Sequence, residues 1–145
     1  IIIDYAHTPE ALRHVLSSIK EIAKEKLITL FGCGGDRDTE KRKSMGEIAK
    51  EFSDLVIVTD DNPRTESPSN IRKDILQGCP NAEEIPDRNK AINYAISKLH
   101  KNDFLLIAGK GHETSQTIGI ETLPFDDYTV AKETIKNIEK SRKAY

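Results

Sequence analysis

The chain has 145 residues, 37% of them hydrophobic and 32% charged, with a formal net charge of −2. This balance indicates a single globular domain and excludes a disordered or fibrous chain. The small net charge gives no general attraction to nucleic acid or to an anionic membrane, and the apolar runs are far shorter than the ~20 residues that cross a bilayer. We therefore expect neither nucleic acid nor membrane as a partner.

The cysteines indicate the cellular compartment of the protein, and the first residues indicate whether the chain is part of a longer protein. Cys33 and Cys79 make no disulfide framework, and no basic leader with an apolar segment is visible. We therefore expect a cytoplasmic protein. The chain opens directly on the buried-strand pattern Ile1–Ile3, without a polar lead-in. We expect it to be a segment of a longer protein.

Short apolar runs mark the expected strands. They are continuous and do not alternate with polar residues, as is typical of parallel strands covered on both faces. In chain order the runs are Ile1–Ile3, Leu27–Phe31, Leu55–Thr59, the weaker Glu83–Pro86, and Phe104–Ala108. A further segment, Thr117–Pro124 with Gly119 at its middle, has the pattern of a small hairpin.

Amphipathic stretches between these runs mark the expected helices. Thr8-Pro9 and Ser67-Pro68 each place a capping residue before a proline, which is a common helix start. Asp87 caps a later helix, and Asp126 or Asp127 caps the last one. The residues expected to face the core are, helix by helix, Leu12, Val15, Leu16, Ile19, Ile22 and Ala23; Met45, Ile48, Ala49 and Phe52; Ile71 and Ile75; Ala91, Ile92, Ala95, Ile96 and Leu99; and Val130, Ala131, Ile135 and Ile138.

The alternation of strands and helices predicts the fold class. It indicates one α/β domain over residues 1–145, doubly wound, with a mostly parallel sheet, helices on both faces and a small C-terminal hairpin. No repeat, low-complexity tract or long linker divides the chain.

Polar side chains follow four of the expected strands at their carboxyl ends, where parallel α/β sheets bind ligands. The four loops are Asp4–Pro9, Gly32–Asp38, Asp60–Arg64 and Gly109–Glu113. If the strands are parallel, these loops open on one edge of the sheet and bring opposite charges into one cleft. Such a cleft suits a zwitterion or a phosphate ester.

Each loop taken alone also has a purely structural interpretation. Glycines after a strand often only make a tight turn, and Asp61–Pro63 fits a turn because proline favours an extended residue before it. His7 fits a half-buried histidine beside a helix start. Surface ion pairs would account for the remaining charges, namely Arg37 with Asp36 or Asp38, and Lys110 with Glu113. Four such loops on one edge favour a binding site.

Common catalytic and cofactor motifs are missing from the sequence. It contains no G-x-x-x-x-G-K-[ST] phosphate loop, and Arg37 stands where a dinucleotide fingerprint starting at Gly32 needs its third glycine. The four histidines lack zinc-binding spacing, and Cys33 fits turn packing better than a nucleophile. We expect no metal site, no catalytic residue and no ATP hydrolysis in this domain by itself.

The loop motifs, taken together and in this order, resemble those of the Mur ligase family. The segment DNPR is similar to the recognition motif of the family's diaminopimelate-adding member. The resemblance covers nearly the whole chain, although each motif alone is weak. The segments that carry it are Asp4–Pro9 (DYAHTP), Gly32–Asp38 (GCGGDRD) with Lys41-Arg42 and Met45-Gly46 behind it, Asp61–Arg64 (DNPR), and Gly109–Glu113 (GKGHE) followed by Gln116.

The resemblance implies a Rossmann-like C-terminal domain of an ADP-forming ligase of peptidoglycan cell-wall synthesis. The N-terminal UDP-substrate domain and the central ATPase domain of such ligases are absent from this chain. ATP would phosphorylate the D-glutamate of UDP-MurNAc-L-Ala-D-Glu, and the amine of meso-diaminopimelate would attack the acyl phosphate. ATP and Mg²⁺ would be bound mainly by the central domain. This domain would hold the amino acid, close over ATP, and be inactive alone.

Residue by residue, the resemblance implies an amino-acid site and a contact with the nucleotide. Arginine can grip the distal carboxylate of diaminopimelate with two parallel hydrogen bonds, and Glu113 can receive the distal ammonium. Asp4 and His7 match positions near the ribose and adenine of ATP. The positions that match the family's diaminopimelate-binding motif are Arg37, Asp61, Asn62, Pro63, Arg64, Gly109 and Glu113.

Two other classes of function stay open on the sequence. One is a related ligase with another amino acid, such as a lysine-adding Mur ligase, a murein-peptide ligase or a folylpolyglutamate synthetase. Arg64 disfavours the lysine-adding enzyme, because it would repel a lysine side chain. The other is a free-standing module that binds nucleotides or amino acids. Lanthionine, a thioether isostere of diaminopimelate, presents the same two ends and fits the same motifs.

Overall fold

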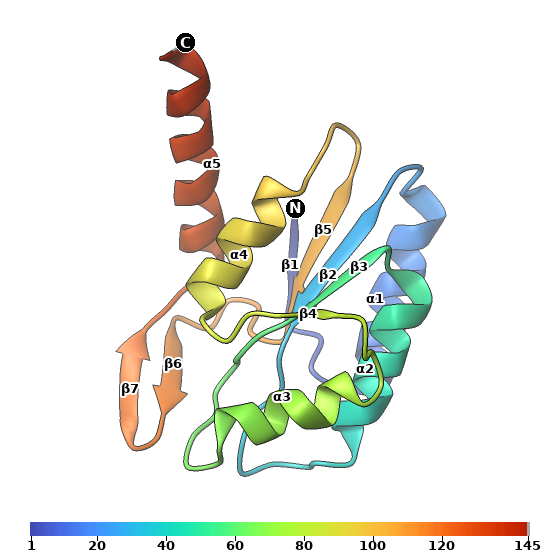
Figure 1. Ribbon diagram of the computed structural model, residues 1–145, viewed down its shortest axis with the longest axis vertical. Coiled ribbons are helices and arrows are strands. Elements are labelled where there is room, and N and C mark those ends of the chain that lie inside the picture. Colours follow the sequence, from blue (N-terminus) through green and yellow to red (C-terminus); the bar gives the residue numbers. More distant parts are fainter. Residues whose placement is uncertain (145) are drawn as a thin grey trace.

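The computed structural model describes residues 1–144, which form one parallel sheet with helices on both faces and an antiparallel hairpin beside it (Figure 1). The strand order in the parallel sheet is β1-β5-β2-β3-β4. The strands are β1 (Ile2–Asp4), β2 (Leu27–Phe31), β3 (Leu55–Val58), β4 (Glu83–Glu84) and β5 (Phe104–Ala108), with β6 (Ser115–Ile118) and β7 (Glu121–Pro124) in the hairpin. The helices are α1 (Pro9–Ile22), α2 (Lys41–Phe52), α3 (Pro68–Leu76), α4 (Arg88–Ser97) and α5 (Asp127–Lys143).

The sheet separates two hydrophobic clusters, as the continuous apolar runs predict. Successive residues of a strand point to opposite faces, so Leu27 and Phe31 of β2 pack with α1, α2 and α3, while Ile28 and Leu30 pack with α4. All five residues of β2 are buried. Figure 1 shows the two layers, with α1, α2 and α3 on one side of the sheet and α4 and α5 on the other. The doubly wound α/β prediction is confirmed.

The helix starts follow the predicted caps with one exception. Thr8 Oγ1 accepts the backbone N–H of Ala11 at 3.2 Å, and Asp87 accepts that of Lys90 at 3.0 Å. Asp126, and not Asp127, caps α5. At α3 the hydroxyl of Ser67 pairs with that of Ser69 and makes no cap bond. The start of α3 therefore depends on Pro68, whose ring presets the first helical φ.

Two predicted core residues are exposed, and one strand is less covered than expected. Ile22 is 63% exposed at the last position of α1, and Ile135 of α5 is 39% exposed. Helix α5 packs on α4, so only the narrow stripe of Asp127, Ala131 and Thr134 is buried. Strand β1 is half-buried because it lies at the edge of the sheet.

The chain reverses direction across the sheet at β5, and this reversal creates the place for a site. From β1 to β4 the connecting helices α1, α2 and α3 lie on one face. Helix α4 then returns on the other face and delivers β5 between β1 and β2. The loops that leave β2 and β5 consequently turn to opposite faces. Such a switch point is where open α/β sheets bind ligands, beyond the carboxyl ends of their strands.

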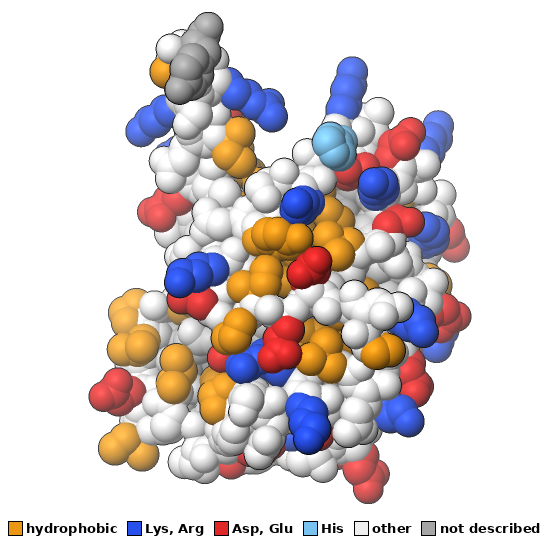
Figure 2. Space-filling model, in the orientation of Figure 1, with side chains coloured by type: hydrophobic (Ala, Val, Ile, Leu, Met, Phe, Trp, Pro, Cys, Tyr) orange, Lys and Arg blue, Asp and Glu red, His pale blue; other side chains and the backbone are white. Residues whose placement is uncertain are grey.

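The hairpin stands beside the sheet and carries apolar side chains outward. Ile118, Ile120 and Leu123 are 43%, 95% and 47% exposed. Figure 2 shows apolar side chains gathered at the lower left, where the hairpin lies in Figure 1. The predicted turn is present, with Gly119 at φ +63°. None of the helices in residues 1–144 is long and apolar enough to cross a membrane.

Candidate functional site

The four loops predicted to share one edge of the sheet meet around a single cavity of about 430 Å³. This volume lies in the usual range of small-molecule sites. The predicted site residues that line the cavity are His7, Arg37, Asp61, Asn62, Arg64, Gly109 and Glu113. Asp4 and Pro63 do not line it. Both signs of charge therefore face one space, as the parallel arrangement of the strands requires.

The turn Asp61–Arg64 is held by the β6–β7 hairpin. The side-chain amide of Gln116 donates to the carbonyl of Asp61 at 2.7 Å. Arg64 pairs with the hairpin backbone on both sides, donating to Thr117 at 3.0 Å and accepting from Gly119 at 2.6 Å. These bonds keep Arg64 at φ +54°, a backbone region that residues other than glycine seldom occupy. The hairpin thus sets the direction in which the Arg64 side chain leaves the backbone.

The loop after β2 is bonded to the same turn. The N–H of Gly35 donates to the carbonyl of Asn62 at 2.8 Å, and Arg64 Nη1 donates to the carbonyl of Gly35 at 2.9 Å. A side chain at position 35 would overlap the carbonyl oxygen of Pro63, which explains why glycine is needed there. Pro63 therefore acts by packing against this loop. Within residues 1–144, both hydrogen bonds of the Arg64 guanidinium use Nη1, and neither uses Nε or Nη2.

Asp36 and Arg42 add a second set of bonds between these two loops. The carboxylate of Asp36 accepts from the hydroxyl and the N–H of Thr65, and these bonds lower the pKa of Asp36. Arg42 is buried in α2, donates both Nη groups to Glu66, and donates to the carbonyl of Gly34 at 3.2 Å. The hydrogen bond from Arg42 lowers the pKa of Glu66. The two loops therefore behave as one unit.

Arg42 was not predicted as a structural residue of the site, although the sequence contains a signal for it. Arg42, Met45 and Ala49 are spaced so that they share the buried face of α2. A charged residue in an apolar stripe needs a partner, and the acidic residues of α3 and of the segment before it supply one. Its Nε makes no hydrogen bond within residues 1–144.

Lys110 lies beneath the cavity. Its side chain is fully buried, and its Nζ lies 3.3 Å from Asp61 Oδ1, 3.1 Å from Asn62 Oδ1 and 3.5 Å from Glu113 Oε2. Lys110 and Glu113 thus form the ion pair considered from the sequence, but its expected place at the surface is wrong, because the ammonium is buried. Asn62 Nδ2 also donates to Glu113 Oε2 at 3.3 Å. One buried cation thus connects three polar residues of the site.

Arg88 supports the bases of two site loops from the other face of the sheet. It forms a fully buried, two-bond ion pair with Asp127, with both N···O distances at 2.8 Å. It also donates to the carbonyls of Asp60 and Ala108, at 3.3 and 3.2 Å. These carbonyls directly precede Asp61 and Gly109. No sequence pattern indicated this role, because Arg88 simply follows a capping aspartate.

The residues on the other side of the cavity are more exposed. Arg37 donates to the carbonyl of Asp36 at 3.0 Å, and in residues 1–144 it forms neither of the ion pairs considered from the sequence. His7 is exposed, not half-buried, and its Nδ1 lies 3.0 Å from the carbonyl oxygen of Tyr5. Asp4 accepts the N–H of Ala6 at 2.7 Å, which is a local turn contact. The nucleotide contacts of Asp4 and His7 stay predictions.

Neither a cysteine nor a metal cluster lies at the cavity within residues 1–144. Burial raises the pKa of Cys33 to about 12, so its thiol stays protonated near neutral pH. Cys33 is 3% exposed and belongs to the hydrophobic cluster with α1, α2 and α3, which confirms packing as its role. Among the described residues, no group of three or more His, Cys, Asp or Glu side chains could hold a metal ion. The arrangement suits binding and orienting a small molecule with charge at both ends.

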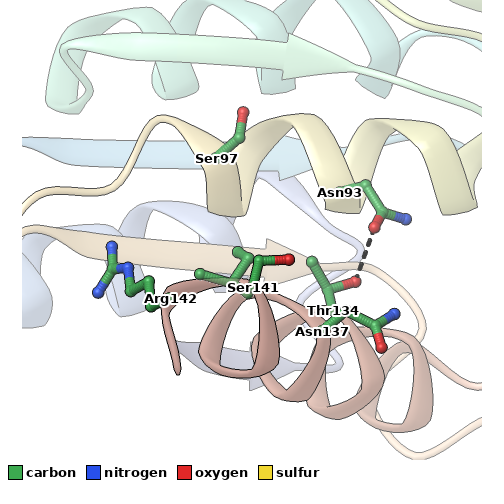
Figure 3. A pocket seen from close by; sticks show the side chains of 7 residues that line it. Asn93, Ser97, Thr134, Asn137, Ser141 and Arg142 are labelled. Atoms are coloured by element: carbon green, nitrogen blue, oxygen red, sulfur yellow. Dashed lines mark hydrogen bonds between the residues drawn. The ribbon is translucent and has the colours of Figure 1, made fainter. Parts of the chain in front are cut away.

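A larger hollow of about 650 Å³ lies between α4 and α5, away from the four loops (Figure 3). Asn93 and Thr134 face each other across it, with the hydroxyl donating to Asn93 Oδ1 at 2.9 Å. Arg142 is its one charged lining residue among those described. Because opposite charges do not converge there, it is a weaker candidate for a zwitterion.

The chain is similar to known proteins in both sequence and structure. Residues 1–111 match the family described as Mur ligase, glutamate ligase domain. A 2,6-diaminopimelate-adding UDP-N-acetylmuramoyl-L-alanyl-D-glutamate ligase of Anaplasma marginale is 52% identical over 141 residues, covering 96% of this chain and 30% of that protein. The ligase of the same description from Rickettsia bellii is 56% identical over 135 residues, covering 90% of this chain and 28% of that protein.

A solved structure of a ligase with the same description superposes with a TM-score of 0.90 at 41% identity. The match covers 94% of this chain and 29% of that one. The chain therefore spans less than a third of the length of the relatives it matches. The family match extends over three of the four site loops completely and over Gly109–Gly111 of the fourth. The chain belongs to the Mur ligase family and corresponds to its glutamate ligase domain.

Proposed function

We propose that this chain is the amino-acid-binding domain of a longer ATP-dependent ligase that adds meso-diaminopimelate to UDP-MurNAc-L-Ala-D-Glu. Relatives about 52% identical are named for that reaction. The reaction would proceed in the cytoplasm, with ATP and Mg²⁺ bound mainly by parts of the ligase outside this chain. This domain would supply no catalytic residue; it would hold the incoming amino acid and close over the nucleotide.

The observation that carries the proposal is the pairing of charges around one cavity. Arg64 and Arg37, which both lie beside Gly34, line the cavity together with Asp61 and Glu113, which both lie beside Lys110. Diaminopimelate has a carboxylate and an ammonium at its distal carbon, and lysine has only the ammonium. An arginine fork binds a carboxylate through two parallel hydrogen bonds, each charge-assisted bond contributing ~1.5–3 kcal/mol.

The same wall explains why lysine would be a poor substrate. Without the distal carboxylate, Arg64 and Arg37 would lose their anion while the cavity is closed around them. A site built on polar partners rejects an analogue that leaves them unpaired by ~10⁴-fold or more. Glu113 and the carbonyl of Gly109 would receive the distal ammonium, with Asn62 beside them.

The contribution to rate would be the placement of the attacking amine. Holding two reactants in a reactive geometry is worth ~7–11 kcal/mol at best. Domain closure would bring the bound amine to the acyl phosphate formed on the other domains. Asp4 and His7 would then lie toward the ribose and adenine of ATP.

The test is the amino-acid specificity of the full-length ligase. We expect turnover with meso-diaminopimelate and at least 10³-fold lower kcat/KM with L-lysine. Lanthionine should be accepted to a comparable degree, because its ends are the same. Comparable kcat/KM values for lysine and diaminopimelate would contradict the proposal.

A second measurement separates the ligase from a free-standing binding module. Calorimetry of residues 1–145 alone with ATP and with diaminopimelate should show weak or no binding, because the proposed cleft is completed by other domains. Micromolar binding of either compound by the isolated chain would instead support a binding module.

A further inference from the structure

Lys110 is the buried cation on which three polar residues of the cavity converge. An ammonium has three N–H donors and no acceptor. Nζ donates hydrogen bonds to Asp61 Oδ1 at 3.3 Å and to Asn62 Oδ1 at 3.1 Å, and it forms an ion pair with Glu113 Oε2 at 3.5 Å. The side chain is fully buried, so these contacts are not shared with bulk water. Two hydrogen bonds and one ion pair thus tie the ammonium to three residues of the site.

We propose that Lys110 is a positioning residue for the incoming amino acid, which orients the Asn62 carboxamide and holds the Glu113 carboxylate in the direction of the distal ammonium. This inference rests on the proposed function of the cavity. It assigns to Lys110 an effect on amino-acid binding that acts entirely through its two neighbours.

The orientation of Asn62 follows from the donors around it. Asn62 Oδ1 lies 3.1 Å from Lys110 Nζ and 3.0 Å from the backbone nitrogen of Thr117. Both groups can only donate, so the oxygen of the amide must face them and the NH₂ group must face away. That NH₂ group donates to Glu113 Oε2 at 3.3 Å. Without the ammonium, Asn62 Oδ1 would keep only the bond from Thr117, and the amide would be held less firmly in this orientation.

The direction of Glu113 follows from the same contacts. Lys110 and Asn62 both approach Oε2, so neither of these contacts uses Oε1. Glu113 is half-buried and lines the cavity, which allows the second oxygen to meet a ligand. Lys110 thus contacts one oxygen of the carboxylate, Oε2, and Oε1 can receive the ammonium of the ligand.

The charge of Lys110 also lets two carboxylates coexist under the ligand. Asp61 and Glu113 would repel each other with no cation between them. The ammonium of Lys110 keeps this part of the wall negative by one charge, which suits one ligand cation.

The test compares Lys110→Met with wild type in the full-length ligase. Methionine has a similar length and no charge, so packing is retained while the three contacts are lost. We expect the KM for diaminopimelate to rise at least 30-fold, while the KM values for ATP and for the UDP-linked substrate change less than 3-fold. The matched control is Lys101→Met at an exposed lysine, which should leave all three KM values unchanged.

A double-mutant cycle separates positioning from a merely structural role. In an Asn62→Ala background, Lys110→Met should raise the KM for diaminopimelate clearly less than it does in wild type, because one of the two residues through which Lys110 acts is gone. Equal effects of Lys110→Met on all three substrates would overturn the inference, and so would full additivity with Asn62→Ala. Lys110→Gln, which retains donors without charge, should have an intermediate effect.

Folding is checked by the thermal unfolding midpoint of each variant. If neither Lys110→Met nor Lys110→Gln folds, Lys110 is a stability residue and the positioning role is overturned. The outcome for the proposed function is separate. A wild-type ligase that does not use diaminopimelate contradicts the function, whereas a diaminopimelate-using ligase whose Lys110→Met variant keeps its KM contradicts only this inference.

Discussion

The two arginines of the cavity differ in how firmly they are held. Arg64 is part of a turn that the hairpin bonds on both sides, and its guanidinium donates to the carbonyl of Gly35. Arg37 is exposed and donates only to the carbonyl of its own neighbour among the described residues. A held side chain loses less conformational entropy when a ligand binds. The Arg64 side is therefore organised without a ligand, and in our proposal the Arg37 side would become ordered on binding.

The residues predicted to bind the amino acid are likewise held more firmly than those predicted to contact the nucleotide. Asp61, Asn62 and Glu113 are joined through buried Lys110, and the loops that carry them are bonded to Arg88. His7 lies on the exposed side of the cavity and packs on Tyr5 with ring centroids 4.6 Å apart. In our proposal another domain completes this open side.

The largest effect is expected on the free energy of unfolding, when Arg88, which supports the loops of the organised side, is replaced. Arg88→Met leaves the fully buried carboxylate of Asp127 without its cation, which costs about 3–5 kcal/mol of unfolding free energy. Urea unfolding of the chain measures this loss. The double variant Arg88→Met/Asp127→Leu should recover most of it, because replacing both partners removes the buried charge. A loss below about 1 kcal/mol in the single variant would contradict the anchoring role.

The next effect concerns Arg64 in the full-length ligase. Arg64→Ala should lower kcat/KM for diaminopimelate about 100-fold, equivalent to about 2.7 kcal/mol, through a higher KM. The KM for ATP should change less than 3-fold. Steady-state kinetics with each substrate varied in turn tests this, with Arg13→Ala on the surface of α1 as the control. Equal changes in the two KM values would remove Arg64 from the amino-acid site.

A smaller effect of the same kind is expected for Arg37. The ligand must order the Arg37 side chain, and the conformational entropy lost in this step offsets part of the binding energy. Arg37→Ala should therefore raise the KM for diaminopimelate about 10-fold. Comparing this value with that for Arg64→Ala measures the benefit of prior organisation. An Arg37 effect larger than the Arg64 effect would reverse the comparison between the two sides.

The smallest effect is a pH dependence of stability. The bond from Arg42 lowers the pKa of Glu66, so the folded state favours the ionised carboxylate. The resulting stabilisation is present above the ordinary carboxyl pKa of roughly 4 and is lost as pH falls through the folded-state value. The midpoint of thermal unfolding should therefore fall more steeply between pH 5 and pH 3 in wild type than in Glu66→Gln. Parallel curves would show that this pair does not contribute.

Much of the fold and the composition of the site could be predicted from residue pattern. β2 and β5 have the bounds of their apolar runs, and His7, Arg37, Asp61, Asn62, Arg64, Gly109 and Glu113 line one cavity. The ligand contacts of these residues stay predictions. The exposure of Ile135 could not be predicted. Helical spacing shows which residues share a face of a helix, but it does not show how much of that face a neighbouring element covers.

The sequence by itself determined the sheet, the order of the four loops and the family, because apolar periodicity and loop motifs are local properties of the chain. Only the tertiary structure decided how the site is supported. The bond between Gly34 and Arg42 spans eight residues, but those from Lys110 to Asp61 and from Arg88 to Asp127 span 49 and 39. Partners so distant are chosen by the packing of helices on the sheet, which determines which buried charge meets which oxygen.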